Sequence, residues 1–353
     1  MKVAIDTRPL QNLSASRGIG VYTSHLIKYL HKSGEVEVVE LKSGKVPETV
    51  DLIHYPWFDL FFHTLPLRKD KPTVVTIHDV TPLVLPEFYP PGIKGRINFE
   101  LQKLALRRTD AVMTDSEVSR RDMIKYLPVR SEKVHKVHLA PQDGLEIETG
   151  DDLLTMVKEK FKLPKEFVLY VGDVNRNKNL LSLVQACKQL EIGLVIVGKQ
   201  AVNDGILKQV QDDGIIHPEL QDLVRLLEEY GKDPQIMRLG FVETKDLAVI
   251  YRLASLFCLP SLYEGFGVSV LEAMKCGCPV LAAKRGSLPE IGGSAAIYVE
   301  PTVDRLMKGI KMILNLSPTQ RKRLIQEGQK RAMLFSWKKT AKEVLEVYKE
   351  VLR

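Results

Sequence analysis

Apolar residues in the first part of the chain occur in short continuous runs that alternate with stretches of helical spacing. Residues 3–6 (VAID) are typical of a buried strand, and residues 21–32 place apolar side chains three and four positions apart, as an amphipathic helix does. This β–α alternation predicts a mostly parallel sheet covered by helices. Further strands are predicted at 36–41, 51–55, 73–79, 111–116 and 134–140, and further helices at 101–109 and 118–127.

The alternation restarts in the second half of the chain. Residues 141–151 mix Pro, Gly and acidic residues, which makes this stretch the best candidate for a linker. The two halves share no residue-level repeat, so the pattern predicts two separate doubly wound α/β domains that face each other. A cleft between such domains is the expected ligand site. The second half predicts strands at 167–173, 193–199, 236–242, 256–261 and 279–283, and helices at 152–163, 179–190, 218–231, 246–254, 268–274, 305–315, 318–335 and 336–353.

Length and composition fit an ordinary two-domain globular protein. The chain has 353 residues, of which 44% are hydrophobic and 27% charged. The opening MKVAIDTRPL contains no signal-peptide apolar region, and no apolar stretch approaches the roughly 18 residues of a membrane span. We therefore expect a cytoplasmic protein. The cysteines lack zinc spacing and are expected to be buried thiols: Cys187, Cys258, Cys276 and Cys278.

The net charge of +7 is concentrated at the C-terminal end. Residues 301–353 hold thirteen Lys and Arg against five Asp and Glu. A solvated helix face is the ordinary explanation. The alternative is a basic surface that meets an acidic partner or an anionic membrane, which would make the protein peripheral at the inner face of the membrane. Nucleic acid is not expected, because no nucleic-acid-binding motif accompanies the charge.

Two predicted strand ends in the second half are candidates for anion binding. Lys178 follows the strand at 167–173 and lies just before a helix, where a lysine and free backbone N–H groups can meet a phosphate. The second candidate is the turn EGFG, in which Gly265 and Gly267 allow a close backbone approach before the helix that begins near Val268. On neighbouring strands these two sites would form a cradle for a diphosphate. Phe266 is expected to be a core anchor.

The first half contains a glycine pair and a histidine at a strand end. Gly18 and Gly20 precede the predicted helix, but G-x-G-x-x-T lacks the third glycine of the dinucleotide fingerprint, so no NAD site is predicted. His78 follows the strand at 73–79 and could hydrogen-bond a sugar hydroxyl or a transferring group. His54 is a weaker candidate of the same kind. The sequence contains no G-x-S-x-G, H-E-x-x-H or P-loop motif.

Seven motifs occur in the order found in the GT-B glycosyltransferases of family 4, and the chain resembles that family over nearly its whole length. The motifs are GIGVY, TIHDVTPL, SEVSRRDM, YVGDVNRNKNL, LGFV, LPSLYEGFGVSVLEAMKCGCPV and GSLPEI. Each motif alone is weak, whereas the ordered set is specific. The family consists of retaining, nucleotide-sugar-dependent enzymes and includes many bacterial mannosyltransferases.

The resemblance implies roles for individual residues. Glu264 matches the family glutamate that binds donor-sugar hydroxyls, and Glu272 matches the second glutamate of the E-x7-E pair, which holds the ribose. Lys178 matches the lysine on the diphosphate, Gly20 the glycine loop that closes on the phosphate, and His78 the histidine near the reacting sugar.

Backbone and base contacts are implied in the same way. The resemblance places Gly265, Phe266 and Gly267 along the donor sugar and the Val268 amide near the diphosphate. It places base contacts at the ends of two predicted strands: Gly198, Lys199 and Phe241.

The chain departs from the family pattern after YVG. Many relatives have arginine at the place of Asp173, and some have Arg-Lys-Asn where this chain has Asn177, Lys178 and Asn179. Arg176 is the candidate for supplying the missing charge beside Lys178.

The resemblance implies domains at 1–147 for the acceptor and 148–335 for the nucleotide sugar, with a final helix at 336–353 that packs back on the first domain. The implied reaction is retaining transfer of a hexose, mannose or glucose first, to a glycan or lipid-linked acceptor. Lys178 and the helix N-termini would stabilise the leaving diphosphate, so no metal or other cofactor is expected. The alternatives are a sucrose- or trehalose-type synthase and a non-catalytic nucleotide-sugar-binding scaffold.

Overall fold

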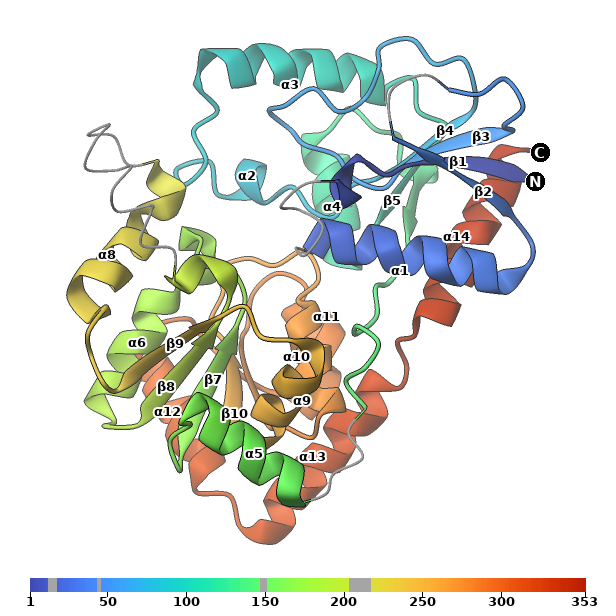
Figure 1. The fold of residues 1–353 in the computed structure, drawn as a ribbon. Coiled ribbons are helices and arrows are strands. Elements are labelled where there is room, and N and C mark those ends of the chain that lie inside the picture. Colours follow the sequence, from blue (N-terminus) through green and yellow to red (C-terminus); the bar gives the residue numbers. More distant parts are fainter. Residues whose placement is uncertain (12–17, 43–45, 147–150, 203–216) are drawn as a thin grey trace. The chain divides into compact units, whose positions relative to one another are not determined.

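The computed structural model describes residues 1–11, 18–42, 46–146, 151–202 and 217–353 (Figure 1). The chain divides into two compact units, which are described separately. Unit 1 comprises Met1–Pro86, Pro90–Gln142 and Phe335–Arg353, and unit 2 comprises Glu87–Tyr89 and Asp143–Leu334.

Unit 1 is built on a six-stranded parallel sheet in the order β2-β1-β3-β4-β5-β6. The inner strands are buried on both faces, as expected for a parallel sheet covered by helices, and their Val, Ile and Ala side chains form the core of the unit. The strands are β1 (Lys2–Asp6), β2 (Glu37–Leu41), β3 (Leu52–Tyr55), β4 (Thr73–Thr76), β5 (Ala111–Thr114) and β6 (Val134–Lys136).

The C-terminal helix belongs to unit 1, where it packs beside α1 (Figure 1). The Trp337 ring stacks on His25 of α1 at 4.8 Å, and the Trp337 indole N–H donates to the Pro141 carbonyl at 3.0 Å. The helices of this unit are α1 (Gly18–Ser33), α2 (Thr81–Val84), α3 (Gly92–Leu106), α4 (Glu117–Tyr126) and α14 (Trp337–Val351), with 3-10 turns at Arg8–Leu10 and Ser131–Lys133.

Unit 2 contains a second six-stranded parallel sheet, in the order β12-β11-β10-β7-β8-β9. Its central strands are again continuous runs of buried apolar residues. The strands are β7 (Phe167–Val171), β8 (Gly193–Val197), β9 (Ile236–Gly240), β10 (Leu256–Leu259), β11 (Val280–Ala283) and β12 (Ile297–Val299).

Helices cover the second sheet, with α12 packed on α6, α13 on α10 and α5 on α9. They are α5 (Asp151–Phe161), α6 (Leu180–Gln189), α8 (Gln221–Tyr230), α9 (Thr244–Leu253), α10 (Val268–Lys275), α11 (Leu288–Gly292), α12 (Val303–Leu314) and α13 (Pro318–Ala332). Four 3-10 turns complete the described part: η4 (Arg176–Lys178), η5 (Lys199–Val202), η6 (Pro218–Leu220) and η7 (Gly293–Ala295).

The predicted fold class, two doubly wound α/β domains, is confirmed. The sequence analysis missed three short elements, α2, α11 and β12. Each has at most five residues, too few to show a periodicity. In addition, α3 begins at Gly92, nine residues before the predicted helix at 101–109. The four cysteines are buried free thiols, as predicted.

His54 is a structural residue of unit 1, so its prediction as a weaker candidate for the site is wrong. It lies within β3 with no exposed surface, and its two ring nitrogens contact the Thr76 hydroxyl at 2.8 Å and the Tyr348 hydroxyl at 2.7 Å. Burial lowers the pKa of His54 from 6.5 to about 3. The imidazole is therefore neutral in the folded protein and joins α14 to the sheet.

Neutral His54 makes the stability of unit 1 depend on pH. In the unfolded chain the imidazole takes up a proton below its ordinary pKa of 6.5, whereas in the folded chain it does so only near 3. Stability is therefore lost as the pH falls through this window, by about 2 kcal/mol from His54 alone between pH 7.5 and pH 5. Both tryptophans, Trp57 and Trp337, lie in unit 1, so their fluorescence during urea unfolding reports on this unit.

The matched control is His54→Gln, which keeps a hydrogen-bonding side chain that does not titrate. It is expected to be less stable than the natural protein at pH 7.5 and to lose about 2 kcal/mol less between the two pH values. An equal loss in both proteins would show that His54 is not the group responsible.

Candidate functional site

The strand order of unit 2 defines where a ligand can bind. β7 and β10 are neighbours in the sheet, and the chain leaves β7 toward β8 on one side and β10 toward β11 on the other. Such a switch point opens a crevice at the carboxyl ends of the two strands. The turn η4 follows β7 and the helix α10 follows β10, so both predicted anion sites lie at this edge.

An ion pair joins the two strand ends. The ammonium group of Lys178 lies 2.8 Å from Glu264 Oε1 and 3.0 Å from Oε2. The Ser261 hydroxyl donates to the same Oε1 atom at 2.6 Å. Glu264 is 8% exposed, so its charge is compensated inside the protein. The structure therefore brings Lys178 and Glu264 together, and it adds Ser261, which the sequence analysis did not select.

Two asparagines hold the η4 turn against the loop after β10. The Asn177 carbonyl accepts from the Leu262 amide at 2.7 Å, and the Asn177 side chain donates to the Tyr263 carbonyl at 3.3 Å. Asn179 adopts a left-handed conformation with φ of 54° and donates to the Pro260 carbonyl at 3.1 Å. Asn177 thus links the η4 turn to the loop after β10 through both its backbone and its side chain.

The backbone of Glu264 is fixed from a third strand end, after β11. The Ser287 amide and hydroxyl donate to the Glu264 carbonyl at 3.1 and 3.0 Å, and Ser287 is fully buried. Gly286 has φ of +53°, and a Cβ atom there would lie 2.5 Å from the Glu264 carbonyl oxygen. Both residues belong to GSLPEI, a motif that the sequence analysis quoted without assigning a role.

Gly267 ends the turn and begins α10. It has φ of 83° and ψ of 50°, and an added Cβ would lie 2.5 Å from Leu288 Cδ2, so conformation and space both require glycine. Within the described part of the chain no side chain caps this helix, so its first amides, from Val268 on, can meet an anionic ligand. Phe266 is 5% exposed, as expected for a core anchor.

Glu272 lies on α10 and is 7% exposed. The Tyr251 hydroxyl of α9 donates to Glu272 Oε2 at 3.3 Å. The structure therefore places Glu272 on the same helix as the EGFG turn but gives it a partner of its own, separate from the Lys178–Glu264 pair.

The predicted base contacts gather at the ends of β8 and β9. The Lys199 ammonium lies 4.8 Å from the centre of the Phe241 ring, and Phe241 is 61% exposed. Gly198 packs against the loop after β7, because a Cβ there would lie 2.1 Å from the Gly172 carbonyl oxygen. An exposed aromatic ring beside a cation can stack on a nucleobase.

Arg176 does not join the Lys178–Glu264 pair in the contacts that the structure shows. Its guanidinium lies 4.4 Å from the Phe88 ring and donates to Gln221 Oε1 at 3.0 Å. Asp173 accepts from the Tyr170 hydroxyl through its backbone carbonyl. The structure therefore places the Arg176 guanidinium with Phe88 and Gln221.

In unit 1, His78 pairs with a carboxylate from the neighbouring strand end. His78 Nδ1 lies 2.8 Å from Asp115 Oδ2, and the Tyr22 ring contacts the imidazole edge to face at 4.7 Å. Burial disfavours the imidazolium, but the charge and hydrogen bond of Asp115 outweigh it, so the pKa of His78 is raised. Its Nε2 atom is buried and makes no hydrogen bond within the described residues. Asp115 was missed because it lies 37 positions away in sequence.

Gly20 lies in the first turn of α1, because this helix begins at Gly18. The expectation that both glycines precede the helix was therefore wrong. Residues 12–17, the rest of the predicted glycine loop, lie outside the described residues.

A polar and aromatic cluster occupies the switch point of unit 1, between β1 and β3. Arg8 donates to both carboxylate oxygens of Asp6, at 2.7 to 3.0 Å, and its guanidinium lies 5.4 Å from the Trp57 ring. The Trp57 indole N–H donates to Asp6 Oδ2 at 3.1 Å. Sequence analysis did not select this cluster, although Asp6 ends a predicted strand and Arg8 and Trp57 each lie two residues after one.

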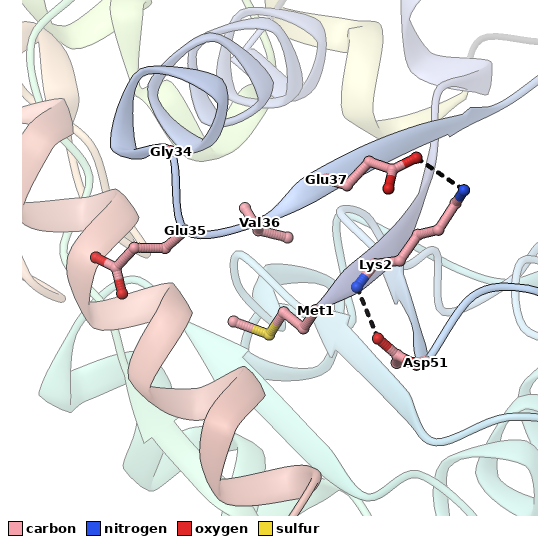
Figure 2. A pocket seen from close by; sticks show the side chains of 7 residues that line it. All are labelled: Met1, Lys2, Gly34, Glu35, Val36, Glu37 and Asp51. Atoms are coloured by element: carbon pink, nitrogen blue, oxygen red, sulfur yellow. Dashed lines mark hydrogen bonds and ion pairs between the residues drawn. The ribbon is translucent and has the colours of Figure 1, made fainter.

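An open pocket at the amino ends of β1 and β2 is unrelated to these sites (Figure 2). Lys2 crosses it to reach Glu37 at 2.7 Å, and the Lys2 amide donates to Asp51 at 2.7 Å. Ligands of parallel sheets gather at the carboxyl ends of strands, so this pocket is no candidate for the main site.

Comparison with known proteins agrees with this organisation. Residues 154–331 match the family model "Glycosyl transferases group 1", and residues 45–140 match "Glycosyltransferase Family 4". O-antigen chain mannosyltransferase B of Escherichia coli is 26% identical over 403 aligned positions, which cover 99% of this chain and 100% of that protein.

Solved structures share the fold at low sequence identity. Sucrose-phosphate synthase from Thermosynechococcus elongatus has a TM-score of 0.74 at 20% identity, covering 99% of this chain and 98% of that one. HepE from Anabaena, solved with UDP-glucose, has a TM-score of 0.72 at 17% identity, covering 99% and 100%.

Two doubly wound parallel sheets of this kind define the GT-B class of glycosyltransferases. The first family match alone spans more than half of the chain. The protein belongs to the glycosyl transferases of group 1 and is a glycosyltransferase.

Substitution of Gly286 tests whether the loop after β11 positions Glu264. In Gly286→Ala the new Cβ would press on the Glu264 carbonyl, displacing the carboxylate from Lys178. We expect nucleoside diphosphate affinity, measured by calorimetry, to fall by at least about tenfold. The matched control is Gly144→Ala, also at positive φ (+86°) in unit 2, where the nearest atom would lie at an ordinary 3.6 Å. Equal affinities in the two variants would contradict the positioning role.

Proposed function

We propose that the protein transfers a hexose, mannose first, from a nucleoside diphosphate sugar to a glycan or lipid-linked acceptor. The observation that carries this proposal is the partly buried Lys178–Glu264 pair at the switch point of unit 2, beside the N-terminus of α10, which no side chain caps within the described residues. Mannose is favoured because the full-length relative is named a mannosyltransferase. The nucleotide sugar is supported by the UDP-glucose bound to HepE.

The donor is proposed to lie along the carboxyl edge of unit 2. Lys178 and the amides from Val268 on bind the diphosphate, and Glu264 accepts hydrogen bonds from sugar hydroxyls. Phe241, with Lys199 above its ring, stacks on the base. Glu272 holds the ribose, for which its hydrogen bond with Tyr251 must rearrange or be shared.

The chemistry requires stabilisation of the leaving diphosphate. As the bond from the sugar to the phosphate oxygen breaks, negative charge collects on the diphosphate and positive charge on the sugar ring. A lysine and a helix N-terminus at fixed positions stabilise the anion without reorganising. The proposal assigns this role to the protein rather than to a metal, so activity should survive EDTA treatment. Loss of activity that Mg²⁺ restores would refute this part.

Retention of anomeric configuration is proposed, with the acceptor attacking from the face that the diphosphate leaves. Glu264 is a poor candidate for a covalent nucleophile, because both its oxygens already accept hydrogen bonds from Lys178 and one also from Ser261. It suits a hydroxyl ligand better. The anomeric proton couplings of the product, compared with those of the donor, decide between retention and inversion.

Unit 1 is proposed to bind the acceptor. Its switch point presents Trp57 beside the charged Asp6 and Arg8, and an indole face with nearby polar groups suits a sugar ring. His78, held by Asp115, can donate or accept a hydrogen bond to the reacting groups through Nε2.

Lys178→Ala should reduce kcat by about 100-fold or more, because one well-placed donor to the leaving group is lost. Nucleotide release from GDP-mannose, UDP-glucose and ADP-glucose, with and without acceptor, measures the effect. His78→Ala should reduce kcat while leaving nucleoside diphosphate affinity unchanged, since it acts outside unit 2.

The control for Lys178 is Lys188→Ala on α6, which also removes an ion pair, with Asp233 at 2.7 Å. Melting temperatures show whether loss of either pair unfolds the protein. Full activity in Lys178→Ala would refute the diphosphate assignment. Saturable nucleotide binding by the natural protein without turnover on any acceptor would refute the transfer reaction.

Trp57→Ala should raise the KM for the acceptor by about tenfold and leave nucleoside diphosphate affinity unchanged, because an aromatic platform of unit 1 and its hydrogen bond to Asp6 are removed while unit 2 keeps its residues. Methyl α-mannoside, mannobiose and a short-chain lipid mannoside serve as acceptors. Trp57→Phe keeps a ring and should be intermediate. An unchanged KM in Trp57→Ala would show that this cluster does not bind the acceptor. Turnover by the natural protein only with fructose or glucose phosphates would favour a sucrose- or trehalose-type synthase.

A further inference from the structure

The helix α3 presents an apolar stripe to solvent. Ile93, Ile97 and Leu104 are four and seven positions apart and therefore lie on one side of the helix. Their side chains are between 50% and 81% exposed. The outer side of a surface helix in a globular protein normally carries polar and charged residues instead. The residues that α3 buries are Gly95, Gln102, Ala105 and Leu106.

The loop between β3 and β4 extends this apolar area. It runs alongside α3, because the Gln102 side chain donates to the Phe62 carbonyl at 2.8 Å and Arg108 donates to the Leu67 carbonyl at 3.3 Å. Phe62 is 70% exposed and Leu67 is 41% exposed. These exposed side chains together are named the α3 surface: Phe62, Leu67, Ile93, Ile97 and Leu104.

The charge around the α3 surface is strongly positive. Residues 92–108 contain five basic side chains and one acidic side chain, Glu100, which pairs with Lys103 at 2.6 Å. At helical spacing the basic residues fall on both sides of the apolar stripe. Long Lys and Arg side chains beside an apolar stripe can reach lipid headgroups while the stripe enters the acyl boundary. The basic residues are Lys94, Arg96, Lys103, Arg107 and Arg108.

We infer that the α3 surface docks unit 1 on an anionic lipid bilayer, with α3 lying in the plane of the interface. The apolar stripe supplies the hydrophobic contact, and the flanking basic residues supply attraction to anionic headgroups. Within the described residues no helix is long and apolar enough to cross a bilayer. A second copy of the chain fits poorly, because a twofold contact would set the basic residues of α3 against each other.

The basic C-terminal region is a weaker membrane surface. Several of its basic residues are paired along their own helices, such as Arg323 with Glu327 at 2.9 Å and Lys349 with Glu346 at 3.0 Å. The excess charge of residues 301–353 therefore does not surround one apolar stripe. Its exposed apolar residues include Met312, Leu314 and Met333, which belong to two different helix ends.

Vesicle co-sedimentation of the full chain tests the inference. The natural protein should bind phosphatidylcholine vesicles that contain phosphatidylglycerol, and bind them less at high salt. The triple variant Ile93→Ser, Ile97→Ser, Leu104→Ser should bind at least about tenfold more weakly. Because these side chains already face solvent, circular dichroism and melting temperature should stay close to those of the natural protein.

The matched control is Met312→Ser, Leu314→Ser, Met333→Ser, which removes three exposed apolar residues from the basic C-terminal region and should bind like the natural protein. Stronger loss in this control than in the α3 variant would overturn the inference. Equal binding to pure phosphatidylcholine would overturn the role of the basic residues. A dimer by light scattering that the α3 variant dissolves, without vesicle binding, would assign the surface to a second copy instead. Lys178→Ala should bind vesicles normally, so failure of the proposed reaction does not affect this test.

Discussion

The ion pair between Lys178 and Glu264 is the interaction on which the donor site depends. Glu264 is nearly buried, and a buried carboxylate without a cation is costly, as is a lysine that loses its carboxylate. The two residues come from strand ends separated by 86 positions in sequence. The two loops that carry them must therefore keep fixed positions relative to each other. Asn177 and Asn179 fix one loop against the other, and Ser287 fixes the backbone under the carboxylate.

The pair also explains how an acidic residue can lie in a turn that is suited to anions. Paired with Lys178 and hydrogen-bonded by Ser261, Glu264 brings little net negative charge to the edge of the sheet. The positive field of the α10 N-terminus is therefore not cancelled. When a diphosphate enters, the ammonium group can be shared between two anions, and carboxylate lone pairs become available to sugar hydroxyls. One pair can thus serve both the charged and the hydroxylated part of a nucleotide sugar.

Much of this arrangement could be predicted from the sequence. Continuous apolar runs identify parallel strands, and their order places Lys178 and the EGFG turn at strand ends, which gave the fold class and the two anion candidates. What escaped prediction depends on side-chain neighbours from distant segments. Asp115 beside His78, Ser261 beside Glu264 and Ser287 beneath it leave no local pattern, since serine and aspartate at strand ends are common for many reasons. The roles of Gly20 and Glu272 remain predictions, because their ligands define them.

Side-chain neighbours from distant segments also decide which side of α3 is exposed. Periodicity reveals that a helix has two different faces, but it does not reveal which face is buried. In α3 the inner face is mixed: Ala105 and Leu106 enter the core, while Asn98 and Gln102 donate to carbonyl groups of the segment beside them, at 2.9 and 2.8 Å. Ile93, Ile97 and Leu104 lie on the other side of the helix and are exposed. An apolar side chain exposed in both the folded and the unfolded chain contributes nothing to folding. Core stability therefore does not account for these three residues. The proposed contact with a lipid bilayer gives them a physical role.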